Sequence, residues 1–162
     1  MNSATTLQQL QHGSPSERAT AAEYLAQQGP AAAYAASELA SACGDTEEVS
    51  NWAVAALEEL GPPPSSTLDA LVRLAQAEKP LIAYWAVTLL GRAGPDAKVH
   101  QRTLANLLQN SGDLAVQEKA AWSLGRIHAD SPQATQALQR AAVSAESRLS
   151  RVAAKALQQT QT

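Results

Sequence analysis

The chain has 162 residues and a net charge of −3, and 45% of its residues are apolar although only 4% are aromatic. This length is enough for one domain with a substantial core. The acidic total argues against nucleic-acid binding, which needs a concentrated basic surface. The single cysteine, Cys43, excludes an internal disulfide framework and a thiolate metal cage.

The sequence also argues against a membrane or secreted protein. No apolar run approaches the roughly 20 residues that are needed to span a bilayer. The N-terminus lacks the charged start and apolar stretch of a signal peptide. We therefore expect a cytoplasmic protein with neither a membrane nor a nucleic acid as its partner.

Helices are expected along the whole chain and no strands, since alanine makes up about a fifth of the residues and apolar residues never alternate over a strand-length run. Gly-Pro steps at Gly29, Gly61 and Gly94 mark helix ends, and we expect each glycine to form a left-handed turn. The predicted helices cover residues 4–11, 15–28, 31–42, 46–60, 66–78, 80–92, 97–109, 114–127, 132–143 and 146–159.

Several helices are predicted to begin with a side-chain cap. Residues with the spacing of a cap followed by an acid are Ser14 with Glu17, Asp45 with Glu48, and Ser66 with Asp69. Asp113 and Ser131 stand directly before two further helices. The chain is thus read as five antiparallel helix pairs joined by short loops.

A phrase Ala-x-x-x-Leu recurs every 32 to 34 residues, with its leucines at positions 25, 57, 90, 124 and 157. Self-similarity at this period indicates a stacked repeat array, because one helix pair cannot bury its apolar face alone. We expect an all-α solenoid in a single domain, 1–162, whose repeats cover approximately residues 1–29, 30–61, 62–94, 95–128 and 129–162.

The second helix of each pair resembles that of HEAT repeats. The resemblance rests on Val49–Leu57 and Leu149–Leu157, which have an alanine-rich centre and a closing leucine, and on the Leu-Gly-Arg steps at Leu90 and Leu124. The alanine-rich form is similar to the bacterial HEAT-like repeats named after phycobilisome lyases. The resemblance implies a right-handed, armadillo-like superhelix whose second helices line a concave face, in a family mostly of scaffolds and adaptors.

Three tryptophans from consecutive repeats lie on one side of the second helices. Trp52 and Trp85 lie five residues before their repeat leucine, and Trp122 lies two before. At about 100° per residue, these positions fall within about 60° of one another and opposite the apolar stripe. We expect a groove there that binds a segment of another protein. The expected binding residues are Trp52, Leu81, Tyr84, Trp85, Lys119, Trp122 and Lys155. The alternative is that the tryptophans pack between neighbouring repeats.

Catalytic patterns are weak, and we expect neither enzyme activity nor a cofactor or metal. His12, His100 and His128 lie apart, and no His-Glu-x-x-His spacing occurs. Two alternative functions stay open. Residues 1–80 carry 3 Lys/Arg against 10 Asp/Glu and residues 81–162 carry 9 against 5, so a monomer could self-associate weakly, head to tail. The resemblance also implies a less favoured role as a bilin lyase or chaperone.

Overall fold

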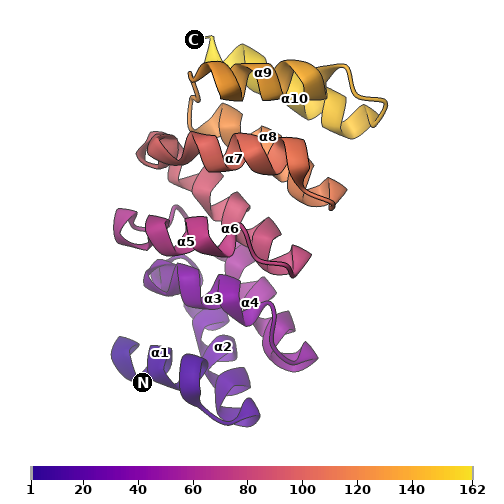
Figure 1. The fold of residues 1–162 in the computed structure, drawn as a ribbon. Helices are drawn as coiled ribbons and strands as arrows, with labels where there is room; N and C mark the ends of the chain where they lie inside the picture. The colour runs from indigo at the N-terminus through magenta and orange to yellow at the C-terminus, as the bar shows by residue number, and fades with distance from the viewer. Residues whose placement is uncertain (1, 162) are drawn as a thin grey trace. The chain divides into compact units, whose positions relative to one another are not determined.

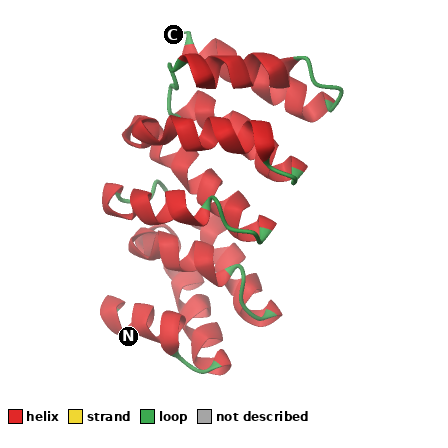
Figure 2. Cartoon of the chain, in the orientation of Figure 1, coloured by secondary structure: helices red, strands yellow, loops and turns green. Residues whose placement is uncertain are grey.

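The computed structural model describes residues 2–161, and these residues fold into helices joined by short loops (Figure 2). The prediction of an all-helical repeat fold is confirmed. The chain divides into two compact units, which we call unit 1 (Met1–Trp85) and unit 2 (Ala86–Thr162). The boundary falls inside one continuous helix, α6 (Pro80–Ala93).

Unit 1 consists of two layers of helices. The first helices, α1, α3 and α5, lie next to one another in one layer, and the second helices α2 and α4 pack against them and against each other (Figure 1). The elements are α1 (Ser3–His12), α2 (Pro15–Gln28), η1 (Gly29–Ala35), α3 (Ala36–Ala42), α4 (Glu47–Glu59), η2 (Ser65–Thr67) and α5 (Leu68–Leu74), followed by the start of α6.

Unit 2 repeats this arrangement. The first helices α7 and α9 pack side by side, and the second helices α8 and α10 pack against them and against each other. The elements that follow α6 are η3 (Gly94–His100), α7 (Gln101–Asn110), α8 (Leu114–Arg126), α9 (Pro132–Ala142) and α10 (Ser147–Thr160).

The repeat phrase forms the core. All five of its alanines are buried, and so are four of its leucines, while Leu157 in the last repeat is half-buried. Burying a leucine side chain contributes about 1.5–3 kcal/mol, and alanine at a fixed site lets the helices approach closely. The recurring phrase therefore specifies where each pair meets its neighbour.

Helix starts agree with the capping pattern in three places. Ser14 and Glu17 form a complete capping box at α2, and Asp113 and Ser131 cap α8 and α9. The other two caps are wrong. Asp45 and Ser66 are not the N-cap residues, since Thr46 precedes α4 and Thr67 precedes α5, and neither threonine makes a side-chain cap bond.

Backbone φ is positive at Gly29 (54°) and Gly94 (64°), where left-handed turns were predicted, but the ψ of −131° puts Gly29 outside the left-handed helical region. Gly61 does not have a positive φ, because α4 ends at Glu59 and the chain leaves it through an extended Leu60. The equivalent residue of the fourth repeat is His128, whose φ of 53° is also positive although it carries a side chain. Repeat geometry thus imposes this conformation on a residue that disfavours it.

Candidate functional site

The second helices of unit 1 expose two large apolar side chains. Trp52 on α4 is 36% exposed and Leu81 on α6 is 41% exposed. Each lies on the side of its helix opposite the buried repeat leucine, as the periodicity predicted. A tryptophan side chain can bury about 150–250 Å², so one that is left exposed on a helix is unusual. Exposed tryptophans of this kind are common anchors at interfaces.

The other two predicted residues of unit 1 are less accessible. Trp85 is only 7% exposed, and Tyr84 is half-buried. Their rings meet edge to face, with centroids 5.6 Å apart and planes at 90°. This is a favourable aromatic geometry. The two rings therefore pack against each other, and this pair is not a second exposed anchor like Leu81.

The start of α6 is fixed against the turn before α4. Lys79 Nζ donates to the carbonyl oxygen of Gly44, and a Cβ atom on Gly44 would collide with the side chain of Ile82. The first turn of α6, which carries Leu81, thereby lies close to the turn that leads into α4. Trp52 and Leu81, the exposed apolar residues of unit 1, therefore lie on helices rather than on loops.

Carboxylates accompany Trp52 on α4. Glu48 lies four residues before Trp52 and Glu59 seven after it, so all three fall within about 40° on one face of the helix. Glu48 and Glu59 are exposed. Glu47 and Glu58 are also exposed but lie about 100° away around the same helix. The face of Trp52 is therefore acidic as well as aromatic.

Trp122 in unit 2 is mainly a packing residue. A Cβ on Gly91 of α6 would collide with the six-membered ring of Trp122, so the indole lies directly over this glycine. Next to it the hydroxyl of Ser123 donates a buried 2.7 Å hydrogen bond to the carbonyl oxygen of Val87. For Trp122 the structure supports the alternative reading, in which the tryptophan packs against the second helix of the preceding repeat.

Two cations lie near the ring of Trp122. Lys119 Nζ lies 4.8 Å from the centre of the indole and the Arg126 guanidinium 6.0 Å, both within range of a cation–π attraction. Lys155 on α10 is exposed. Unit 2 thus offers cationic side chains on its second helices, where unit 1 offers carboxylates.

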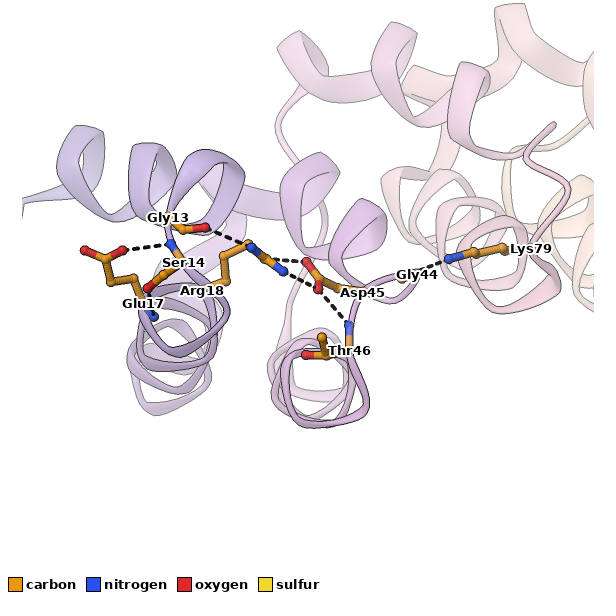
Figure 3. Close-up of polar contacts among 8 residues, drawn as sticks. All are labelled: Gly13, Ser14, Glu17, Arg18, Gly44, Asp45, Thr46 and Lys79. Carbon is orange, nitrogen blue, oxygen red and sulfur yellow. Dashed lines mark hydrogen bonds and ion pairs between the residues drawn. The ribbon is translucent and has the colours of Figure 1, made fainter.

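A chain of polar contacts links the turns of unit 1, and the sequence patterns did not reveal it (Figure 3). The guanidinium of Arg18 donates to both Asp45 oxygens, at 2.7 and 2.8 Å, and to the carbonyl oxygen of Gly13 at 2.8 Å. The hydrogen bonds from Arg18 hold the pKa of the Asp45 carboxyl below its usual value. These contacts connect the first repeat with the second. An arginine in the first turn of α2 and the Gly44-Asp45 turn are the signals that could have predicted them.

The remaining candidates carry no chemistry. A shallow 380 Å³ depression between the first helices of unit 1 is lined by side chains that include Glu38, Asp45 and Arg73. Burial raises the pKa of the Cys43 thiol to about 12, which leaves it as an inert thiol. Within residues 2–161, no three His, Cys, Asp or Glu side chains are grouped so as to hold a metal ion. None of the helices in that range is long and apolar enough to cross a membrane.

Comparison with protein families gives one result. The model of a family described as HEAT repeats matches the chain twice, over residues 3–91 and again over residues 68–158. The two matches together cover nearly the whole chain. No curated protein matches the sequence.

Two solved structures share the fold. A crystal structure of an engineered protein from the Northeast Structural Genomics Consortium is similar with a TM-score of 0.67 and 20% identity, over 98% of this chain and 81% of that one. A designed armadillo repeat protein in complex with the peptide (KR)4 gives a TM-score of 0.66 and 17% identity, over 96% and 80%. At these identities the likeness concerns the fold.

Proposed function

Because the chain belongs to the HEAT-repeat family, we propose that it is a non-catalytic binding module that holds a segment of another protein in the groove along its second helices. This helical repeat fold is commonly a protein-interaction scaffold. The designed armadillo protein of similar fold, which is in complex with a peptide, supports a peptide segment as the ligand class.

One observation carries the proposal, namely the exposure of Trp52 and Leu81 on rigid helices. Interface energy is concentrated in a few aromatic or aliphatic anchors, with Trp among the most frequent. Tyr84 and Trp85 lie on the same helix as Leu81, where their rings pack edge to face. In unit 2, the cations Lys119 and Lys155 would form a separate surface that attracts acidic groups, and the cation–π contact would orient Lys119 beside Trp122.

The test is affinity capture with a double variant, Trp52→Ala/Leu81→Ala. We expect the variant to lose the partners that the wild-type protein retains, with at least a tenfold loss of affinity for a directly binding partner, since a central tryptophan anchor is worth about 2 kcal/mol or more. Both side chains are exposed, so the far-ultraviolet circular dichroism and the unfolding midpoint should change little.

A matched control uses apolar residues that are exposed elsewhere. Val99 in η3 is 82% exposed and Val143 after α9 is 85% exposed, and neither lies on a second helix. The variant Val99→Ala/Val143→Ala should retain every partner. Equal losses in the two variants, or no loss in either, would contradict a binding site on the second helices.

A second candidate function is self-assembly, and the charge distribution favours it. The boundary between the two units separates the charges, since 10 Asp/Glu and 3 Lys/Arg lie in unit 1 and 5 Asp/Glu and 9 Lys/Arg in unit 2. Exposed charge attraction is screened over about 8 Å at physiological ionic strength. Self-association of this kind should therefore appear in sedimentation velocity at low salt and disappear at high salt, whereas binding through Trp52 should persist.

A further inference from the structure

None of the three cations of unit 1 lies on α4, the helix that carries Trp52. Of its three cations, Arg18 is engaged by Asp45 and Gly13, and Lys79 donates to the carbonyl of Gly44. Arg73 is on α5, a first helix. The ten carboxylates of the unit are thus opposed by few cations. Within the described residues, no lysine or arginine lies on the side of α2 that carries Glu23 or anywhere on α4.

The side of α4 that carries Trp52 also carries carboxylates that form no ion pair in the described part of the chain. Glu48 and Glu59 flank Trp52 on α4, and within residues 2–161 neither of them pairs with a lysine, arginine or histidine. Glu23 takes the equivalent side of α2 and accepts only a 3.4 Å contact from the amide of Gln27. The surface combines one exposed indole with negative charge from two neighbouring second helices.

We propose that this face binds an extended segment rich in lysine and arginine, a proposal that rests on the binding function given above and specifies its ligand. An arginine or lysine can lie over the Trp52 ring, where the cation is attracted to the aromatic face. Flanking cations then meet Glu48 and Glu59, which are about 16 Å apart along the helix axis. In Trp122, by contrast, the equivalent cation positions are already filled by Lys119 and Arg126.

An acidic segment would not suit this face. It would bring like charges together without any cation of the protein to offset them, and such juxtaposition is strongly unfavourable. A purely apolar segment would cover Glu48 and Glu59 without satisfying them, which carries a desolvation cost. A cationic segment with small spacer residues is the chemistry that satisfies both the ring and the carboxylates.

The experiment uses the full chain and two labelled nonapeptides in fluorescence anisotropy. One peptide alternates arginine with serine, and the other alternates glutamate with serine. We expect the arginine peptide to bind and the glutamate peptide to show no binding in the same range. Raising the salt concentration should weaken the binding without abolishing it, because the charge pairs are screened while the contact with Trp52 persists.

Two double variants of equal net charge distinguish an effect of the carboxylates beside Trp52 from an effect of the overall charge. Glu48→Gln/Glu59→Gln removes the carboxylates beside Trp52, and Glu47→Gln/Glu58→Gln removes two from another side of α4 with the same spacing. Each changes the net charge from −3 to about −1. We expect the first double variant to lower the affinity for the arginine peptide by roughly two- to thirtyfold, because two exposed ion pairs are lost. The second double variant should leave this affinity nearly unchanged.

Three results would overturn the proposal: equal weakening by both variants, binding of the glutamate peptide as tight as that of the arginine peptide, and no binding of either peptide. A wild-type protein that sediments as a dimer and becomes monomeric in Glu48→Gln/Glu59→Gln would assign the face to a second copy, and would also overturn it. If Trp52→Ala/Leu81→Ala still loses captured partners, the binding function stands without this ligand. If that capture is unaffected, the binding function itself fails.

Discussion

His128 shows how the repeat geometry overrides a single residue. The first and third repeats place a glycine at this point, and His128 shares their positive φ, with a value of 53°. A non-glycine residue pays about 1–2 kcal/mol for this conformation. Its ring offers only an exposed 3.1 Å contact between Nδ1 and the carbonyl oxygen of Gln159. The side chain therefore offsets little of the backbone cost.

We expect His128→Gly to raise the free energy of unfolding by about 0.5–1 kcal/mol, since relief of the strain exceeds the entropy that glycine adds to the unfolded chain. Urea denaturation monitored by circular dichroism measures the change. The companion variant His128→Ala keeps the strain and loses the ring contact, so it should be no more stable than wild type. A destabilised His128→Gly would show that the ring contact is the dominant factor.

The ion pair between Arg18 and Asp45 predicts a dependence of stability on pH. The hydrogen bonds from Arg18 lower the pKa of Asp45 in the folded state, so its contribution is present above the carboxyl pKa of the unfolded chain, about 4, and is lost as the pH falls through the lower folded value. We expect Asp45→Asn to be less stable than wild type at pH 6, and the gap to shrink below about pH 4. A gap that is constant between pH 6 and pH 3 would contradict this origin.

At the scale of elements, glycine sets the distance between second helices. A Cβ on Gly91 would strike Trp122 and Ser123 of α8, and one on Gly125 would strike Ala156 and Gln159 of α10. Alanine would otherwise favour the helix. The glycine that follows the repeat leucine in the third and fourth repeats is therefore a packing requirement.

We expect Gly91→Ala to destabilise the protein by about 1–3 kcal/mol, because overpacking forces α6 and α8 apart or moves the Trp122 ring. Gly112→Ala is the control, since a Cβ there meets nothing within 4 Å. Thermal or urea unfolding of the two variants measures the difference. A Gly91→Ala protein as stable as the control would mean that the two helices are free to adjust.

The sequence predicted the helices and the core because both follow from local rules. Caps at Ser14, Asp113 and Ser131 and buried repeat alanines need only spacing along one helix. The site was predicted less well, because angular position on a helix does not say what the neighbouring helix covers. Trp52 and Trp85 occupy equivalent positions, yet only Trp52 is exposed. Periodicity alone cannot separate them.

At the scale of the whole molecule, a single domain was predicted from the sequence and stays a prediction. The structure has two compact units, but their boundary lies within α6. In repeat proteins each repeat is stabilised by its neighbour. Here one continuous helix runs through the boundary between the units. We therefore expect the chain to unfold in one cooperative transition.

Single-unit fluorescence tests this expectation. Trp122→Phe leaves tryptophans only in unit 1, and Trp52→Phe/Trp85→Phe leaves only Trp122, in unit 2. Within each variant, the urea midpoint from fluorescence should coincide with that from circular dichroism, which reports on both units. A fluorescence transition that separates from the circular dichroism transition would define two domains.

The central claim is that the face of Trp52 is where a partner binds, and site-specific photo-crosslinking tests it most directly. p-Benzoylphenylalanine at position 52 should cross-link to one recurring segment of a partner protein, identified by mass spectrometry. The same probe at Gln8, an exposed site on the first helix α1, should not. Cross-links from Gln8 that equal or exceed those from position 52 would contradict the account.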